Sequence, residues 1–429
     1  MTKRNSNLPV KGTMDFPPEA MRQHNYLCKI VNDVALRFHF EEYDLPTLES
    51  WETFAQKSSE EILNDQSYHF VDRGERKLIL RPEITPSLAR MVSKDVKNRP
   101  LPLRWYTIGR CYRYENPQMG RLREFHQLNF DILGKNHPLF DIEIIRVAIQ
   151  LLSSLKVEKN KYIICYNHRH LVNFLLKANH FSAQEKKDFF YLIDRREKLS
   201  QEVFTSEVEK KLKKEKGEIL KNFLKCSSIE EVWNNLIKND SLKKEPSSEM
   251  LYNQLVLFEE LLTKSNLREN CVFSPSVVRG FDYYTGMVFE VFDQSKNIRR
   301  SIFGGGRYDD LIGRYSDEKV SGVGFGMGTY VLSLFLKNLG LLKSLEQAEK
   351  RIMIAPLEED VLGFCLILSE KLMEEAAVEI STPAKVKSHF KKAEQKNFTH
   401  IILIGEEEQK NQIYVLRDVK TGDEKKYDV

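Results

Sequence analysis

Polar and charged side chains gather in separated stretches of this sequence, and their types could bind and activate a ligand. In "VVRGFDYYTG", residues 277–286, an arginine, an aspartate and two tyrosines stand directly before the apolar run "MVFEVF". The other stretches are "LRPEITPSLARM" (80–91), "YRYENPQMGRLREFHQLNFD" (112–131) and "FGGGRYDD" (303–310). Arginines can hold anionic groups, and carboxylates, amides and hydroxyls can exchange hydrogen bonds with a ligand.

Taken singly, each of these stretches also has an ordinary structural explanation. Glu83 can cap a helix, arginines in a polar loop can simply be solvated, and three consecutive glycines can make a tight strand turn. Tyrosines and aspartates often end strands with hydrogen bonds. Their combination makes these residues candidates for a ligand site: Glu83, Thr85, Arg113, Glu115, Arg121, Gln127, Asp131, Arg279, Tyr283, Tyr284 and Arg307.

A long β-hairpin is predicted to position the residues of the second stretch. Segments 101–115 and 124–134 are rich in strand-forming residues, and they are joined by the polar loop "NPQMGRLR". Because side chains alternate along a strand, Gln127, Asn129 and Asp131 share one face and apolar residues occupy the other. The pattern therefore places an amide-and-carboxylate surface beside a basic hairpin tip.

The remaining elements follow from hydrophobic periodicity. Apolar residues recur at helical spacing from Leu27 to Phe38, which predicts an amphipathic helix. Residues 167–265 are rich in Lys and Glu and predict a solvated helical insertion, since the interleaved Glu disfavours a dedicated RNA patch. Beyond residue 345, strand and helix signals alternate and predict a separate α/β domain of about 80 residues.

Composition restricts the class of protein. With 429 residues, of which 41% are hydrophobic, the chain can fill two or three domain cores. The formal net charge of +4 means that any nucleic-acid contact must come from local basic patches. The six cysteines show no CxxC spacing, which argues against a zinc site and favours a reducing cytosol. Without a run of about 18 apolar residues, we expect no membrane span and a cytoplasmic location.

In order and spacing, these stretches resemble the histidyl-tRNA synthetase family of class II aminoacyl-tRNA synthetases over nearly the whole chain. "Arg113-Tyr114-Glu115" and the following loop resemble motif 2, which other class II enzymes share. "VVRGFDYYTG" and "SIFGGGRYDDL" resemble two signatures specific for histidine enzymes and are far more discriminating. The helix before Pro46 resembles motif 1, a dimer element, so a homodimer is implied.

The resemblance implies an α+β fold and a reaction. A class II catalytic domain with a mainly antiparallel sheet would occupy residues 1–344, including the helical insertion at about 167–265. An α/β anticodon-binding domain would occupy residues 345–429. The implied reaction joins L-histidine to ATP, forming histidyl-adenylate, and then transfers histidine to the 3′ end of histidine tRNA. ATP would be a substrate and Mg²⁺ would neutralise its phosphates, with no metal ligands assigned in the protein.

The resemblance also implies roles for the candidate residues, and the chemistry is consistent with them. Two anions meet when a carboxylate attacks the α-phosphate, so preplaced cations are expected to catalyse the step. Catalysis is implied for Arg279 and Arg113, histidine binding for Glu83, Thr85, Arg113, Gln127, Asp131, Arg279, Tyr283 and Tyr284, and ATP binding for Arg113, Glu115, Arg121 and Arg307.

This chain departs from the family pattern at two places. The family usually has glutamate where Asp131 stands, so the pocket floor should be one methylene shallower. Motif 3 commonly carries Glu-Arg where this chain has Tyr330 and Val331, and the missing arginine would clamp the γ-phosphate. Since valine carries no charge, another cation should compensate, with Arg121 the first candidate and Arg307 the second.

Two other functions remain as alternatives. A non-catalytic histidine-binding paralogue, resembling the regulatory subunit of ATP phosphoribosyltransferase, is favoured only by the motif 3 departure. Such a protein is expected to lack both the "RGFDYY" arginine and the C-terminal domain, and this chain has both. A class II synthetase for another amino acid is opposed by the two histidine signatures. The enzyme specific for histidine is therefore the favoured reading.

Overall fold

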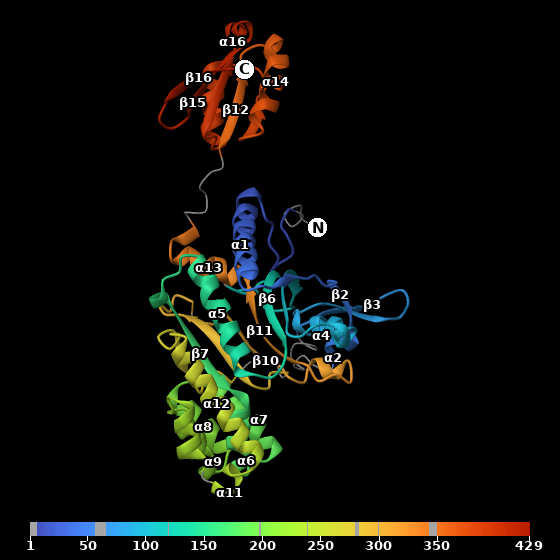
Figure 1. Cartoon of the computed structure of the whole chain (residues 1–429), viewed down its shortest axis with the longest axis vertical. Coiled ribbons are helices and arrows are strands. Elements are labelled where there is room, and N and C mark those ends of the chain that lie inside the picture. The colour runs from blue at the N-terminus through green and yellow to red at the C-terminus, as the bar shows by residue number, and fades with distance from the viewer. Residues whose placement is uncertain are drawn as a thin grey trace. The chain divides into compact units, whose positions relative to one another are not determined.

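The computed structural model describes residues 7–55, 66–118, 120–196, 199–237, 239–278, 283–298, 300–342 and 350–429. The chain divides into two compact units, Met1–Lys343 and Ser344–Val429. Each unit has a sheet and a hydrophobic core of its own (Figure 1).

A large, mainly antiparallel sheet is the centre of the first unit. Its order across the described strands is β1-β5-β6-β11-β10-β9-β7-β8. The strands are β1 (Glu41–Glu42), β5 (Leu103–Tyr112), β6 (Glu124–Gly134), β7 (Tyr162–His168), β8 (Cys271–Phe273), β9 (Met287–Asp293), β10 (Phe303–Arg307) and β11 (Ser321–Gly328). Only the edge pairs β1–β5 and β7–β8 of these strands are parallel. The predicted α+β fold with a mainly antiparallel sheet is confirmed.

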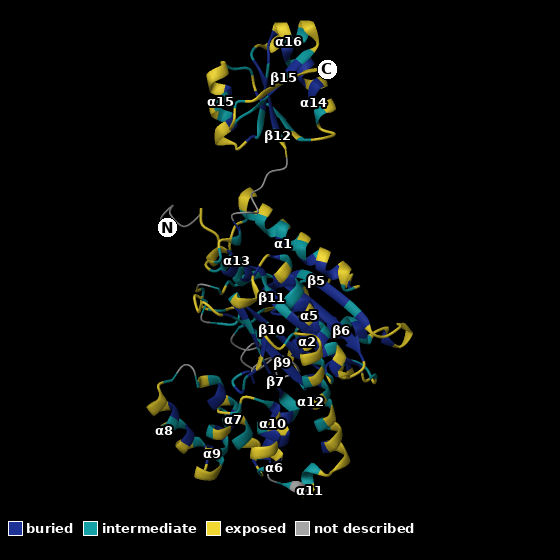
Figure 2. Ribbon diagram, turned by 60° about the vertical axis from the view of Figure 1, so that its left-hand side comes forward, coloured by how far each residue is buried: buried dark blue, intermediate teal, exposed yellow. Residues whose placement is uncertain are grey.

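The predicted hairpin is β5 and β6, which pair from Leu103↔Leu133 to Tyr112↔Glu124. Leu128, Phe130 and Ile132 are buried on one face of β6, where α1 (Pro18–Arg37) and α5 (Pro138–Ser154) contact each other and α5 contacts the sheet (Figures 1 and 2). The opposite face of β6, which carries the polar residues, is therefore free of this helical layer.

A second, smaller sheet and several helices complete the first unit. The described strands β2 (Leu48–Ser50), β4 (Lys77–Leu80) and β3 (Tyr68–Val71) form a second sheet in that order. The helices around the sheets are α2 (Trp51–Ala55), α4 (Thr85–Ser93) and α13 (Thr329–Asn338). Helix α4 begins at Thr85, two residues after Glu83, so the start of its first turn is close in sequence to that carboxylate.

A group of helices connects β7 to β8. They are α6 (Arg169–Ala178), α7 (Ala183–Arg195), α8 (Gln201–Lys211), α9 (Lys214–Phe223), α10 (Ile229–Glu231), α11 (Asp240–Lys243) and α12 (Pro246–Lys264). Helix α7 begins with a capping box, in which Ser182 and Glu185 bond each other's backbone amides. Helix α12 packs against α5, which joins this helical group to the main sheet.

The second unit is a small α/β domain. Its sheet has the order β13-β12-β14-β15-β16 among the described strands, with β12 parallel to both β13 and β14. The elements are β12 (Arg351–Pro356), α14 (Leu362–Leu372), β13 (Ala377–Ile380), α15 (Val386–Gln395), β14 (His400–Ile404), α16 (Glu406–Asn411), β15 (Ile413–Asp418) and β16 (Glu424–Asp428). Ile352, Ile354, Ile402 and Ile404 belong to its core.

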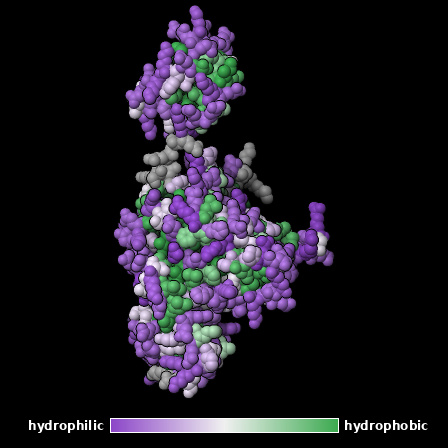
Figure 3. All heavy atoms as spheres, in the orientation of Figure 1, coloured by the Kyte–Doolittle hydropathy of each residue, from purple (hydrophilic) through white to green (hydrophobic). Residues whose placement is uncertain are grey.

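Hydrophilic residues cover most of the face drawn in Figure 3. No helix in the described part of the chain is long and apolar enough to cross a lipid bilayer.

Candidate active site

A cavity of about 1630 Å³ lies on the polar face of the large sheet. Residues of β6, β9, β10 and β11 line it, together with the β5–β6 loop and the first turn of α13. Polar residues of the predicted strand face reach it together: Gln127, Asn129 and Asp131. The alternation read from the sequence thus places them on the cavity side.

The floor of this cavity is made of backbone, because glycines stand opposite the polar residues of β6. In the antiparallel register, Gly324 faces Asp131 and Gly326 faces Asn129. A Cβ atom at 326 would lie 2.8 Å from Nε2 of Gln127, and one at 324 would overlap Oδ1 of Asp131. Gly304 of β10 pairs with Gly326 and continues the floor. Glycine positions on β10 and β11 therefore leave space next to the polar wall.

Asp131 is the most buried acceptor at this wall, with only 1% of its surface exposed. Its Oδ1 accepts a hydrogen bond from the Tyr308 hydroxyl at 2.5 Å, whereas its buried Oδ2 has no hydrogen-bond partner among the described residues. Burial raises the pKa of Asp131 to about 7, although the Tyr308 hydrogen bond favours the ionised form. A buried oxygen with an unused lone pair fits an N–H donor of a bound ligand.

A second carboxylate, Glu83, lies buried at another side of the site. It accepts a hydrogen bond from the Tyr283 hydroxyl at 2.7 Å. Thr85 accepts one from Asn129 at 3.4 Å, and Gln127 donates to the same Asn129 at 2.8 Å. These contacts pair Glu83 with Tyr283, and they link Thr85 to Gln127 through Asn129.

The segment that carries Glu83 is fixed by Arg81. The buried guanidinium of Arg81 donates from Nε to the Arg110 carbonyl and from Nη1 to the Leu45 carbonyl, each at 2.7 Å. It thus anchors the chain just before Glu83 to β5.

Three tyrosines form an aromatic corner at the cavity. The ring of Tyr283 lies 5.0 Å from that of Tyr284 and 6.0 Å from that of Tyr308, measured between centroids. All three line the cavity. Burial raises the pKa values of all three hydroxyls, so each stays protonated and can donate a hydrogen bond at neutral pH. The corner offers flat apolar walls with polar tips.

The hairpin supplies cations at the rim. Arg113 lines the cavity and donates from Nε to the Pro82 carbonyl at 2.9 Å, which ties it to the Glu83 segment. Arg121 also lines the cavity and pairs with Glu115 at 3.0 Å. The arrangement concentrates positive charge at the loop while Glu115 orients one of the arginines.

Two of the predicted arginines, Arg279 and Arg307, differ from those of the hairpin. Arg279 lies outside the described residues, although Tyr283 and Tyr284 of the same stretch line the cavity. Arg307 is buried: its side chain is 2% exposed and pairs with Asp141 at 2.9 Å and Asp309 at 3.4 Å.

Other polar partners occupy the rest of the Arg307 guanidinium. Nη1 donates to Ser321 Oγ at 2.5 Å, and Nη2 donates to the His137 carbonyl at 3.1 Å. With these hydrogen bonds directed to the protein, this side chain joins β10 to α5. The expected contact between Arg307 and ATP stays a prediction.

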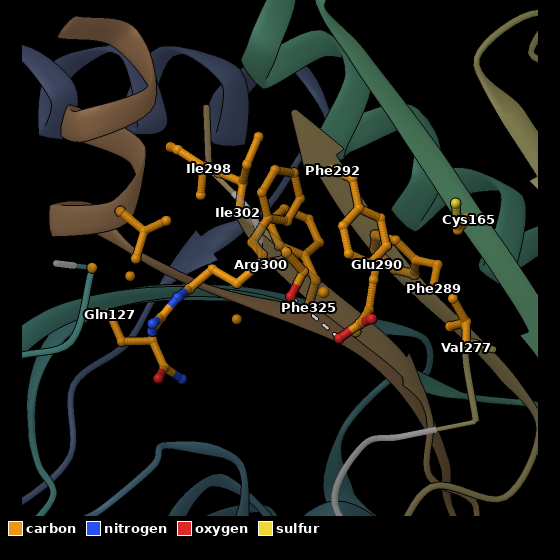
Figure 4. A pocket seen from close by; sticks show the side chains of 18 of the residues that line it. Gln127, Cys165, Val277, Phe289, Glu290, Phe292, Ile298, Arg300, Ile302 and Phe325 are labelled. Atoms are coloured by element: carbon orange, nitrogen blue, oxygen red, sulfur yellow. Dashed lines mark hydrogen bonds between the residues drawn. The ribbon is translucent and has the colours of Figure 1, made fainter. Parts of the chain in front are cut away.

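Tyr308, Asn129 and Arg300 were not among the predicted site residues. Tyr308 stands next to the triple glycine of the signature, so its position was a usable signal for a site role. Asn129 was predicted to share the polar face. Arg300 had no such signal, because it lies in a polar turn before β10. Figure 4 shows its side chain in the cavity, pointing toward Gln127.

The cavity offers carboxylates but, among the described residues, no dedicated metal cage. No cluster of three or more potential metal ligands occurs within the described ranges. Mg²⁺ usually takes one or two carboxylates together with substrate phosphates. Glu115 and Glu290 both line the cavity and could serve in this way.

The sequence is similar to those of known proteins along most of its length. A family profile described as histidyl-tRNA synthetase matches residues 12–332, and one described as anticodon binding domain matches residues 351–429. The histidine–tRNA ligase of Leptospira biflexa is 36% identical over 412 residues, covering 95% of this chain and 92% of the relative. That of Methanococcus aeolicus is 32% identical over 428 residues, covering 98% and 97%.

Solved structures share the fold. Histidyl-tRNA synthetase from Nostoc superposes with a TM-score of 0.81 at 20% identity, covering 99% of this chain and 97% of that one. An ATP phosphoribosyltransferase regulatory subunit/histidyl-tRNA synthetase from Bacillus halodurans gives 0.74 at 22% identity, covering 93% and 98%. The family profile covers most of the chain, and the two relatives are more than 30% identical over nearly its whole length. The chain therefore belongs to the histidyl-tRNA synthetase family.

Proposed function

We propose that this protein is a histidine–tRNA ligase that activates L-histidine with ATP and transfers it to histidine tRNA. The observation that carries the proposal is the buried Asp131, whose Oδ2 has no partner among the described residues, at the end of a glycine-floored cavity with arginines at its rim. An imidazole N–H fits that oxygen, and a triphosphate fits the rim.

Histidine would bind with its ring toward Asp131 and Tyr308. Tyr284 would meet the other ring nitrogen, and Tyr283 would form a wall. Glu83, Thr85 and Gln127 would hold the α-ammonium group, since they offer a buried carboxylate and two neutral acceptors. Asn129 joins Thr85 to Gln127, and Glu83 accepts a hydrogen bond from Tyr283. These polar groups would remain unpaired with an apolar amino acid, which opposes its binding.

Activation would join two anions at the rim. A carboxylate oxygen of histidine forms a bond to the α-phosphorus of ATP, the bond to the β-phosphate oxygen breaks, and pyrophosphate leaves. Arg113 would hold the α-phosphate and the carboxylate, and Arg121 would reach the distal phosphates. Arg279 would add a second cation at the reacting centre, a role inferred from the sequence signature alone. Mg²⁺ would neutralise the triphosphate, with Glu115 and Glu290 near it.

Transfer would then follow at the same site. A hydroxyl at the 3′ end of the tRNA attacks the histidyl carbonyl, its proton is lost, and AMP departs. Gln118, Arg121 and Arg123 lie on the hairpin loop that borders the cavity, so we place the acceptor end of the tRNA along this loop. The unit of residues 345–429 would bind the anticodon.

The assembly and location are also proposed. Helix α1 carries the segment that resembles motif 1, a dimer element, and this resemblance supports a homodimer built from the unit of residues 1–344. A cytoplasmic location follows from the place of protein synthesis.

The test is ATP–pyrophosphate exchange with each amino acid in turn. We expect exchange with histidine and with no other amino acid. The second candidate, a histidine-binding regulatory subunit, is favoured by Tyr330 and Val331 in place of the motif 3 Glu-Arg. Exchange with none of the amino acids, combined with histidine binding, would support that candidate and refute the ligase.

A further inference from the structure

Arg300 is a cation of the cavity that the family signatures do not assign. It lies between β9 and β10, is partly buried and lines the cavity with Gln127 and Val331. Figure 4 shows its side chain extending across the cavity toward Gln127. Its guanidinium therefore faces the space that the proposed ATP would occupy.

The side chain of Arg300 lies next to the position where motif 3 lacks its arginine. A Cβ atom placed on Gly120 would lie 3.7 Å from Nε of Arg300 and 3.8 Å from Cγ2 of Val331. The side chains at 300 and 331 thus approach the same point of the hairpin loop from two different elements. A guanidinium from either position could reach the same part of a ligand.

Arg300 also differs from the other cavity arginines in its contacts. Within the described part of the chain, no hydrogen bond or ion pair is formed by its guanidinium. Arg121 pairs with Glu115 at 3.0 Å, and Arg307 pairs with Asp141 at 2.9 Å. Burial and, next, the nearby charge of Arg121 lower the pKa of Arg300. Glu115, which pairs with Arg121, is the nearby negative charge and acts in the opposite direction. Two neighbouring cations beside one carboxylate favour a multiply charged anion.

We propose that Arg300 binds the terminal phosphate of ATP in place of the missing motif 3 arginine. The proposal rests on the proposed function, and it assigns the clamp to a residue just before β10 instead of the first turn of α13. Arg121 would approach the same phosphates from the loop. A planar guanidinium can span two phosphate oxygens, which lysine cannot do.

The test compares nucleotides that differ by one phosphate. Arg300→Ala should weaken ATP binding by about 10- to 100-fold, the loss expected for charge-assisted hydrogen bonds, and should change ADP binding by less than about threefold. Isothermal titration calorimetry measures both affinities. Equal losses for ATP and ADP, or no loss for ATP, would refute the assignment.

A second substitution separates a phosphate contact from a structural effect. Val331→Arg in the Arg300→Ala background should recover most of the ATP affinity, because the new side chain reaches the same point. In the unchanged protein it should give less than about threefold gain. Failure of the recovery, in a variant that still binds histidine and unfolds at the wild-type temperature, would overturn the proposed replacement.

The control is Arg22→Ala, which removes one positive charge from the surface of α1. ATP affinity should not change in this variant, so a loss there equal to that of Arg300→Ala would reduce the effect to net charge. Different results would contradict the phosphate contact of Arg300 and the ligase activity. Absence of exchange in the unchanged protein refutes the ligase, whereas normal histidine-dependent exchange with unaltered ATP affinity in Arg300→Ala refutes only the clamp.

Discussion

Replacing Asp131 with asparagine should stabilise the ligand-free protein at pH 8 while it weakens histidine binding. The carboxylate is 1% exposed, and burial raises its pKa from 3.8 to about 7. In the folded state the proton is therefore held up to about pH 7, whereas in the unfolded chain it is lost near pH 4. The contribution of Asp131 to stability is thus greatest below pH 4 and falls as the pH rises to about 7.

The magnitude follows from the same difference. Each tenfold change in proton affinity corresponds to ~1.4 kcal/mol, so holding Asp131 ionised above pH 7 costs about 4 kcal/mol at most. An asparagine carries no charge and its carbonyl can still accept from Tyr308. Its amide N–H groups would lack acceptors at the Oδ2 position, which costs about 1–3 kcal/mol. We therefore expect a net gain of about 1–3 kcal/mol at pH 8, shrinking as the pH falls toward 4.

Calorimetric unfolding of the ligand-free protein between pH 5 and pH 8 measures this gain. The control is Asp293→Asn, because Asp293 is also buried but accepts hydrogen bonds from Ser295 and Ile298. That variant should lose stability at pH 8. Histidine affinity of Asp131→Asn should fall about 10- to 100-fold through loss of a charge-assisted hydrogen bond.

Two results would contradict this reasoning. A lower stability of Asp131→Asn at pH 8 would show that the buried charge of Asp131 does not destabilise the folded protein. An unchanged KM for histidine together with a raised KM for ATP would show that Asp131 does not contact the imidazole ring.

Three other changes test the remaining assignments. Arg307→Ala should lower the free energy of unfolding by about 3–5 kcal/mol, because it leaves the buried Asp141 and the partly buried Asp309 without their cation, and chemical denaturation will detect the loss. Arg279→Ala should slow single-turnover adenylate formation by roughly 10²–10³-fold if its guanidinium stabilises the transition state, and an unchanged rate would make it a structural arginine. Deletion from Leu345 onward should leave ATP–pyrophosphate exchange largely intact but weaken aminoacylation of tRNA, and equal loss of both activities would argue against a domain that mainly binds tRNA.

Local periodicity was sufficient for the parts of the site that lie on one strand. The alternation of β6 predicted that Gln127, Asn129 and Asp131 share a face, and the register of β6 with β11 places them at the cavity. The mainly antiparallel fold and the terminal α/β unit were also predictable, because the signature stretches and the strand–helix alternation are local patterns.

Contacts between distant segments could not be predicted in this way. Arg307 pairs with Asp141, which lies 166 residues away in the sequence. Nothing in "FGGGRYDD" indicates this partner. That Arg300 and Val331 both lie near Gly120 likewise depends on how the hairpin loop packs in the assembled fold. A charged residue in a polar turn is most often solvated, and only the assembled sheet shows that this one enters the cavity.

The glycines of the cavity floor also determine how this site can vary in evolution. Glycine is the smallest residue, so every missense change at positions 304, 324 or 326 adds atoms, and none removes them. At 324 the first added carbon already overlaps Asp131. Substitutions in the walls can enlarge or reduce the cavity, because the side chains there can become smaller or larger. Substitutions of the floor glycines can only reduce its volume. Adaptation to a different ligand is therefore open at the rim and closed at the floor.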